Sequence, residues 1–305
     1  RNLFLSLLSG LALSFSWPEL GVLFILFFAF VPLLILEDEI QKSDDSKKGI
    51  QVFWFSFLSF FIFNAITTYW IYHATLFGAI AAFLVNATLM ATAFFLFHKV
   101  KSATSDRLGY LAFVVFWISM EYLHLNWGLS WPWLILGNGF ANFPDVVQWF
   151  EFTGFLGGSL WLLLMNILVF KLTRKQNFKS ILLPLLLLII PITISYYVIP
   201  ETKEDDPLKV LIVQPNVDPY VDKFSIGYEQ QLTDFIELAK PYLTQETQLL
   251  IGPETALLEG IWENRIENSY SIKVFNDLQK NFPNLNILVG ASTYKMFGDT
   301  DQKTA

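Results

Sequence analysis

The chain contains no cysteine, only three histidines and few charged residues among its 305 positions. Without cysteine, these residues can form no disulfide bond, no thiolate-ligated metal site and no cysteine nucleophile. The histidines, His73, His98 and His124, lie far apart and lack the spacing of metal ligands, so we expect neither a metal nor a cofactor. Charged residues make up 15% of the chain, whereas soluble domains usually carry about 25%, and this deficit indicates a membrane protein.

The charges are distributed unevenly along the chain. Residues 1–200 carry a net charge near +1, and residues 201–305 carry a net charge near −8. The first part therefore suits lipid and the second part suits water. We predict a transmembrane helical domain at 1–200, a polar linker at 201–207 and a separate domain at 208–305.

Seven apolar stretches fall within the first 200 residues. A helix needs about 20 residues to cross roughly 30 Å of hydrocarbon, and ~17 is near the lower limit. The first two stretches are short and are separated by a break at 17–19, so a re-entrant hairpin is an alternative, although two spans fit the charge pattern better. We predict about seven spans, at residues 3–17, 20–36, 50–72, 76–97, 108–126, 154–170 and 181–199.

The basic residues of the membrane part predict its orientation. They fall at Arg1 and in the connections after the second, fourth and sixth spans, and the other connections contain none. The positive-inside rule assigns these connections to the cytoplasm, and an odd number of spans then places residues after 199 outside. The residues concerned are Lys42, Lys47, Lys48, Lys99, Lys101, Arg107, Lys171, Arg174, Lys175 and Lys179.

Two features lie near the expected outer face. The connection at 127–153 is long and rich in Trp, Phe, Gly and Pro, which is typical of an aromatic belt at the membrane interface and equally of a wall of a lipid-facing cleft. Glu121 lies inside the fifth span, where a carboxylate is costly and suggests function. A protonated or hydrogen-bonded structural role explains Glu121 at least as well.

The pattern changes after the linker. Short apolar runs at 209–214, 249–254 and 286–292 indicate buried strands. Between them, Leu232, Phe235 and Ile236 mark an amphipathic helix at 228–242, and Val274 and Leu278 belong to a second helix. This alternation predicts an α/β layer fold with the strands in one sheet.

One segment of this domain carries a candidate catalytic residue. The run LLIGPETALLEG places Glu254 at the carboxyl end of a buried strand, where ligand sites of open α/β sheets gather. A carboxylate partly withdrawn from water there is suited to taking a proton near neutral pH. The alternative is an ordinary loop glutamate that caps a following turn, and spacing alone favours this alternative.

Several apolar spans followed by VLIVQPNVDPYVDKF, LLIGPETAL and NILVGAS resemble the apolipoprotein N-acyltransferases. The runs TTYWIYHATLFG, MEYL and SWPWLILGN are also similar to the membrane part of that family. The resemblance covers essentially the whole chain. It implies a polytopic membrane domain joined to the first part of a nitrilase-like (carbon–nitrogen hydrolase) αββα sandwich, incomplete at its C-terminal end.

The resemblance also implies an activity. Glu254 would be the general base of a Glu–Lys–Cys triad, and the Cys would take an acyl chain from a membrane phospholipid as a thioester. That chain would pass to the α-amine of the diacylglyceryl-modified Cys of an apolipoprotein, in the last step of lipoprotein maturation. The partners would be these two lipids and not nucleic acid, and the site would lie at the outer face of a bacterial inner membrane.

The sequence departs from the family pattern at the triad. It has no Cys, and the family's Lys and Cys follow the third strand of the domain, where this chain ends. Lys295 comes too soon after that strand to match and is better interpreted as a solvated loop lysine. A final span after the nitrilase-like domain is also expected and is not among these residues. We therefore expect these 305 residues alone to be inactive.

Three interpretations follow. The chain is the front portion of a longer acyltransferase, a complete non-catalytic relative that binds lipids or lipoproteins, or a transporter or scaffold with an extracytoplasmic α/β module. A transporter would need paired polar or broken segments at mid-membrane depth, and Glu121, Asn64 and Asn86 offer little of that kind. The first interpretation agrees best with the order of the motifs.

Overall fold

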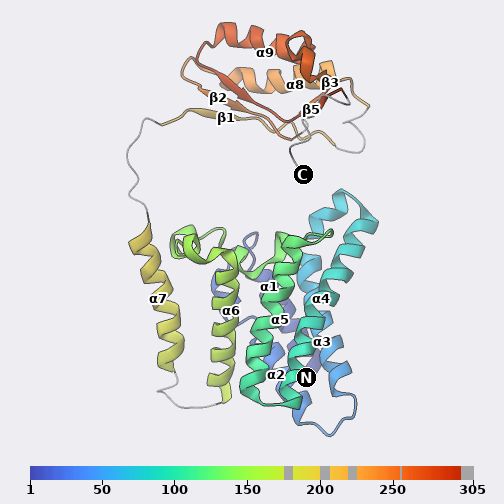
Figure 1. The fold of residues 1–305 in the computed structure, drawn as a ribbon, viewed down its shortest axis with the longest axis vertical. Coiled ribbons are helices and arrows are strands. Elements are labelled where there is room, and N and C mark those ends of the chain that lie inside the picture. The colour runs from blue at the N-terminus through green and yellow to red at the C-terminus, as the bar shows by residue number, and fades with distance from the viewer. Residues whose placement is uncertain (175–180, 200–206, 219–224, 255, 297–305) are drawn as a thin grey trace. The chain divides into compact units, whose positions relative to one another are not determined.

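A computed structural model describes residues 1–174, 181–199, 207–218, 225–254 and 256–296 (Figure 1). The chain divides into two compact units, Arg1–Glu201 and Thr202–Ala305. The first unit is a helical bundle, and the second is an α/β unit.

The bundle consists of α-helices joined by short 3₁₀ turns (Figure 1). Its described α-helices are α1 (Asn2–Phe15), α2 (Val31–Lys42), α3 (Lys48–Thr67), α4 (Leu76–Ala103), α5 (Asp106–Asn126), α6 (Phe150–Arg174) and α7 (Leu182–Val198). Its 3₁₀ turns are η1 (Leu23–Phe27), η2 (Tyr69–His73), η3 (Pro132–Leu134), η4 (Leu136–Phe140) and η5 (Pro144–Val146).

Four of these helices, α3, α4, α5 and α6, are long and apolar enough to cross a membrane. They correspond to four of the predicted spans. The apolar helices α1 and α7 have 14 and 17 residues, so at about 1.5 Å per residue they rise less than the hydrocarbon thickness. The predicted count of seven spans therefore remains a prediction.

The second predicted span, at 20–36, is wrong as a single helix. Gly21 adopts a φ of 78°, the chain then forms η1, and α2 begins only at Val31. Pro32 lies in the first turn of α2, where its missing N–H costs nothing because that group has no partner within a helix. The apolar sequence thus forms a turn and a short helix instead of a straight span.

Asn166 of α6 stabilises this break. Its Oδ1 accepts a hydrogen bond from the backbone N–H of Phe30 (2.8 Å), and its Nδ2 donates to the carbonyl of Leu26 (2.9 Å). Irregular backbone at membrane depth is tolerated only where protein satisfies its polar groups. The buried Asn166 does so at the junction of η1 and α2. Around it pack aromatic rings such as Phe30 and Trp117, whose centroids lie 4.8 Å apart, edge to face.

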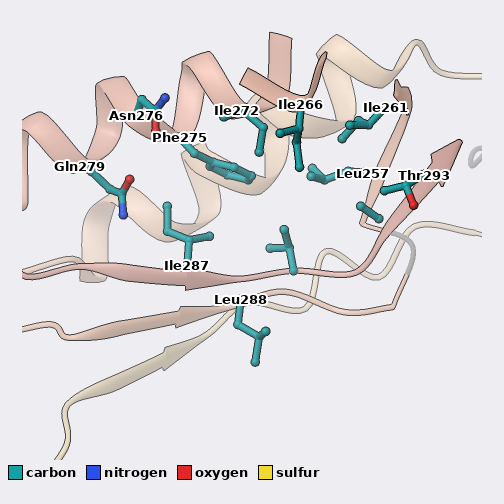
Figure 2. A pocket seen from close by; sticks show the side chains of 12 residues that line it. Leu257, Ile261, Ile266, Ile272, Phe275, Asn276, Gln279, Ile287, Leu288 and Thr293 are labelled. Atoms are coloured by element: carbon teal, nitrogen blue, oxygen red, sulfur yellow. The ribbon is translucent and has the colours of Figure 1, made fainter. Parts of the chain in front are cut away.

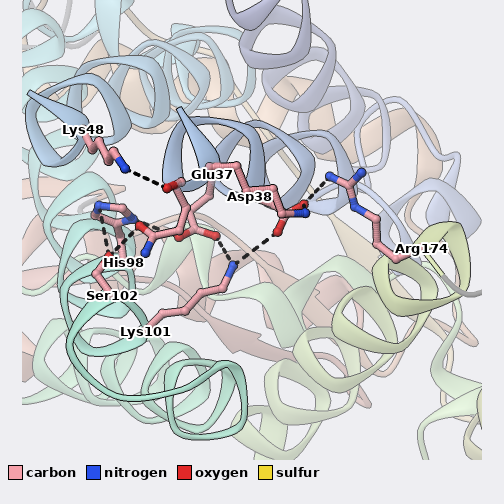
Figure 3. Close-up of polar contacts among 9 residues, drawn as sticks. Glu37, Asp38, Lys48, His98, Lys101, Ser102 and Arg174 are labelled. Carbon is pink, nitrogen blue, oxygen red and sulfur yellow. Dashed lines mark hydrogen bonds and ion pairs between the residues drawn. The ribbon is translucent and has the colours of Figure 1, made fainter. Parts of the chain in front are cut away.

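One end of the bundle holds a charge cluster, of which Glu37, His98 and Lys101 are buried (Figure 3). Glu37 on α2 is fully buried, and its two oxygens contact His98 Nδ1 (2.8 Å) and Lys101 Nζ (2.5 Å), both on α4. Asp38 contacts Arg174 at the end of α6 (2.5 Å). Because ionised groups are stable inside a protein only when paired, the Glu37 contacts join α2 to α4, and the more exposed pair of Asp38 and Arg174 adds the end of α6. The charge cluster consists of Glu37, Asp38, His98, Lys101 and Arg174.

The charge cluster marks what we call the basic end of the bundle. Lys42 pairs with Asp38, Lys48 donates to the carbonyl of Gln41 (2.9 Å), and Arg1 pairs with Glu39. The N-terminus, the connections after α2 and α4 and the last turn of α6 therefore meet at one end, which is the lower end in Figure 1. These connections are the ones in which the sequence concentrates Lys and Arg. Lys175 and Lys179 lie outside the described residues.

We predict that Lys101→Met lowers the free energy of unfolding by about 3–5 kcal/mol, because it leaves the buried carboxylate of Glu37 without its cation. Lys42→Met is the matched control: the Lys42 side chain is 68% exposed, so its ion pair with Asp38 should contribute at most ~1 kcal/mol. Denaturant titration of the two variants in detergent micelles measures the difference. Equal losses would contradict a structural role for the cluster.

The α/β unit contains two parallel strand groups (Figure 1). Strands β1 (Val210–Ile212), β2 (Leu249–Ile251) and β4 (Asn286–Leu288) form one sheet in the order β1-β2-β4. These are the three strands that the sequence predicts. Strands β3 (Leu257–Trp262) and β5 (Ala291–Tyr294) form a separate pair that the apolar runs did not reveal.

Helices α8 (Tyr228–Ala239) and α9 (Tyr270–Asn281) lie on one face of the β1-β2-β4 sheet (Figure 1). Their apolar sides bury Phe235 and Phe275 against Leu250 of β2, as the predicted amphipathic pattern requires. Two 3₁₀ turns, η7 (Lys240–Tyr242) and η8 (Glu263–Asn268), complete the described elements. By contrast, alternate strand residues are apolar and exposed: Ile212 is 71% exposed and Leu288 is 59% exposed.

Candidate functional site

Glu254 follows directly on strand β2. The chain leaves the sheet at Gly252, whose N–H donates to the carbonyl of Leu288 (2.9 Å), and Pro253 then accepts a hydrogen bond from Gly290 N–H (3.2 Å). A Cβ at position 252 would lie 2.8 Å from Val289 Cγ1 and 2.9 Å from Phe235 Cε2, so only glycine fits this close approach. The turn that presents Glu254 is therefore held on both sides.

Glu254 lies where the chain passes between the two strand groups. After β2 the chain continues through Glu254 to β3, and after β4 it continues through Gly290 to β5. The two passages touch, because Gly290 N–H bonds to Pro253 O and Leu257 N–H bonds to Gly290 O (3.1 Å). Because β1, β2 and β4 are parallel, their carboxyl ends share this edge of the sheet.

The Glu254 side chain is exposed, so the expectation that it is partly withdrawn from water is wrong for these residues. The reason is that the strand ends at Ile251 and the turn carries residue 254 beyond the packed layer. Within the described part of the chain, Glu254 has no ion-pair partner, and Lys295 is exposed after β5. Residue 255 lies outside the described residues.

An apolar cavity of about 320 Å³ lies between α9 and the strands (Figure 2). Figure 2 shows Phe275 of α9 pointing toward Ile287 and Leu257, with Asn276 and Gln279 at the rim. The described residues that line it do not include Glu254. The cavity therefore belongs to the packing between α9 and the strands and not to the turn that carries the carboxylate.

Glu259 of β3 was missed by the sequence reasoning. Its two carboxylate oxygens accept hydrogen bonds from the first backbone N–H groups of α9, at Tyr270 (2.7 Å) and Ser271 (2.8 Å). Partial burial alone would raise the pKa of Glu259, but the hydrogen bonds from Ser271 and Tyr270 outweigh burial and hold that pKa below its usual value. The carboxylate caps α9 from outside the helix.

We predict that Glu259→Gln weakens α9 by about 1 kcal/mol, because a neutral amide caps a helix N-terminus less well than a carboxylate does. The lowered pKa gives the sign of the pH dependence: the contribution is present above the ordinary glutamate pKa and is lost as pH falls through the lowered value. Hydrogen exchange of the first turn of α9 at pH 7 and at pH 3 measures this. A wild-type protection that does not change with pH would contradict the cap.

Glu121 of α5 is buried near the opposite end of the bundle from the charge cluster. Its Oε1 accepts hydrogen bonds from Trp117 Nε1 (3.0 Å) and from the backbone N–H of Leu136 (2.9 Å). Next to it, Ser159 Oγ accepts from Gly137 N–H (3.0 Å). Glu121 thus connects the start of η4 to α5. These contacts favour the prediction that Glu121 has a hydrogen-bonded structural role.

We predict that Glu121→Leu destabilises the bundle by about 3 kcal/mol, because it leaves an indole N–H and a backbone N–H buried without an acceptor. Glu121→Gln keeps a carbonyl oxygen at the same position and should cost less than about half as much. Denaturant titration in detergent compares the two variants. A Gln variant as unstable as the Leu variant would show that the charge of Glu121, and not its role as acceptor, is what matters.

The connection at 127–153 is partly buried in the bundle and partly exposed, and both interpretations of its sequence remain predictions. Leu136 and Phe140 are fully buried in the bundle core, whereas Trp133 is 55% exposed and contacts Trp70 of η2 at 5.4 Å between ring centroids. A cavity of about 230 Å³ opens beside Phe140 and Phe155. A second cavity of about 500 Å³ lies between α1 and α3, lined by Trp17, Ile66 and Tyr69 among others.

No described group of three or more His, Asp or Glu residues could hold a metal ion. The described residues therefore offer two functional features. One is an apolar helical bundle with a charged end, and the other is an α/β unit with a carboxylate at the carboxyl end of a strand. Together they define a membrane protein with an attached α/β unit.

Comparison with known proteins names the family. Residues 9–168 match the family model described as the apolipoprotein N-acyltransferase N-terminal domain. The chain is 30% identical over 270 residues to the apolipoprotein N-acyltransferase of Chlorobaculum tepidum. The aligned residues make up 84% of this chain and 49% of that protein. The chain belongs to the apolipoprotein N-acyltransferase family.

Further relatives agree with this assignment. The apolipoprotein N-acyltransferase of Geobacter metallireducens is 24% identical over 84% of this chain and 51% of its own length. Apolipoprotein N-acyltransferase 1 of Treponema denticola is 22% identical over 88% of this chain and 52% of its own length. The chain spans about half the length of the curated relatives it matches.

Proposed function

We propose that the protein carrying this chain is an apolipoprotein N-acyltransferase in which Glu254 is the general base. The observation that supports this most is the position of Glu254, held at the carboxyl end of β2 by the Gly252 and Gly290 contacts, in a chain of this family. A base at such an edge is open to substrates that approach from the carboxyl ends of the strands.

The proposed reaction has two steps. Glu254 accepts the proton of a Cys thiol, and the thiolate attacks the ester carbonyl of a phospholipid, so that a lysophospholipid leaves as the alcohol and a thioester remains. The α-amine of the diacylglyceryl-Cys of an apolipoprotein then attacks the thioester, which forms an amide and restores the thiol. A Lys stabilises the oxyanion of both steps. The nucleophile is not among these 305 residues, so they alone are inactive.

The exposed face of the β1-β2-β4 sheet supports an αββα sandwich. Val210, Ile212 and Leu288 are apolar and at least 43% exposed, and apolar strand residues of this kind normally pack against a second layer. In the proposed protein, a second sheet of the nitrilase-like domain covers this face.

We propose that the bundle crosses a bacterial inner membrane about seven times, with its basic end in the cytoplasm. The described basic residues of the connections support this, because they gather at one end of the bundle. Both substrates are lipid-anchored, so a site in the periplasm can receive them laterally from the outer leaflet. The cavity between α1 and α3 lies away from the basic end and suits such an approach.

We predict that Glu254→Gln in the complete gene product lowers N-acylation at least about 100-fold, because an amide cannot accept the thiol proton. Complementation of a bacterial strain depleted of its own N-acyltransferase, with mass spectrometry of lipoprotein N-termini, measures this. Glu237→Gln is the matched control, since Glu237 is exposed on α8 and pairs with Lys240 (2.5 Å).

Two results would overturn the proposal. A wild-type gene product that inserts in the membrane but never N-acylates would indicate a non-catalytic relative that binds lipids or lipoproteins, or a transporter or scaffold. If the Glu254→Gln variant is active, Glu254 is not the general base, although the protein is still an N-acyltransferase.

A further inference from the structure

The bundle has a further apolar groove, away from the two cavities of the bundle described above. It lies between α5, α6 and α7 and has a volume of about 410 Å³. Its walls are aliphatic, for example Val114 of α5, Leu164 of α6 and Leu187 of α7, and Lys171 lies at one end of it. The proposed acyl transfer does not use this groove.

The groove follows α6 over the thickness of one leaflet. It runs from Leu160 to Lys171 on that helix, which at 1.5 Å per residue is about 16 Å. One leaflet contributes about 15 Å of hydrocarbon. Lys171 lies in the last turn of α6, and Arg174 of the charge cluster is three residues further along, at the end of the same turn. The groove therefore opens toward the head groups at the basic end.

At the other end of the groove, a hydrogen bond joins α6 to α7. Pro191 in α7 has no N–H to donate to the carbonyl of Leu187, four residues earlier, and Trp161 Nε1 donates to that carbonyl instead (2.7 Å). This contact joins α6 to α7 next to Leu160. It keeps the two helices together at the end of the groove that lies away from Lys171.

Lys171 places a positive charge at one end of the groove, which favours a ligand with a negative charge. Its Nζ lies 4.8 Å from the ring centroid of Tyr110, and among the described residues it forms no ion pair with a carboxylate. A cation in this position at the membrane surface attracts a lipid phosphate. The groove is also too small for a helix, because a helix about 10 Å wide and 16 Å long fills roughly 1,300 Å³.

We propose that this groove binds one acyl chain of an anionic phospholipid from the leaflet at the basic end, with its phosphate at Lys171. The proposal rests on the proposed insertion of the bundle in a membrane, and it concerns a lipid that is bound and not consumed. The acyl donor of the proposed reaction approaches from the other leaflet.

The test is native mass spectrometry of the complete gene product in detergent, titrated with phosphatidylglycerol or phosphatidylcholine. We expect the first phosphatidylglycerol to bind about five-fold more tightly than phosphatidylcholine, and Lys171→Gln to remove this preference while Lys171→Arg keeps it. Lys99→Gln is the matched control, because Lys99 is also exposed at the basic end and also lies over an aromatic ring, Phe95, at 5.4 Å.

A second pair of variants tests the groove itself. Leu164→Trp should fill it and abolish the first binding event for both lipids, whereas Leu96→Trp on α4 should not, although the two leucines are similarly exposed at 37% and 38%. The proposal is overturned if Lys99→Gln acts as strongly as Lys171→Gln, or if Leu164→Trp binds lipid normally. It is also overturned if a photo-crosslinker at position 164 captures a protein helix instead of a lipid. N-acylation is measured separately, so failure of either proposal leaves the other standing.

Discussion

The contact of Glu37 with His98 and Lys101 is the interaction on which the bundle depends most. A fully buried carboxylate is tolerated only when both of its oxygens are satisfied, and both partners come from one helix, α4. Helix α2 has 12 residues and buries an apolar side in the bundle core, including Leu33 and Leu36, and the Glu37 contact joins this packed helix to α4. Next to it, the partly exposed pair of Asp38 and Arg174 connects α2 to the end of α6.

Away from that end, polar side chains inside the bundle mainly satisfy backbone. Asn166 completes the broken stretch before α2, and Glu121 accepts the N–H of Leu136 at the start of η4. In a medium without water, each irregular segment needs such a partner. Glu259 does the same for α9 in the α/β unit. Backbone hydrogen bonds of Gly252 and Gly290 likewise hold the turn before Glu254, so the backbone position of this exposed residue is well defined.

Features with a local cause could be predicted from the sequence. The helical spacing of Leu232, Phe235 and Ile236 indicated α8, and the Gly-Pro break indicated that β2 ends just before Glu254. Features that depend on distant partners could not be predicted. Glu37 and His98 are 61 residues apart, so nothing near either residue reveals their contact. The strand pair β3–β5 was missed because its residues alternate between buried and exposed positions only weakly, and the exposure of Glu254 depends on where the turn leaves the sheet.

The hydrogen bond between Trp161 and the carbonyl of Leu187 makes the effect of replacing Trp161 depend on Pro191, which lies 30 positions further along the sequence. If Pro191 were replaced by a residue with an N–H, α7 would form its own bond to Leu187 and compete with the indole for that oxygen. If Trp161 were replaced alone, the carbonyl would face lipid without a donor. The dependence therefore runs one way: among related sequences, tryptophan at 161 should be lost only where residue 191 is no longer proline, because otherwise the Leu187 carbonyl has no donor.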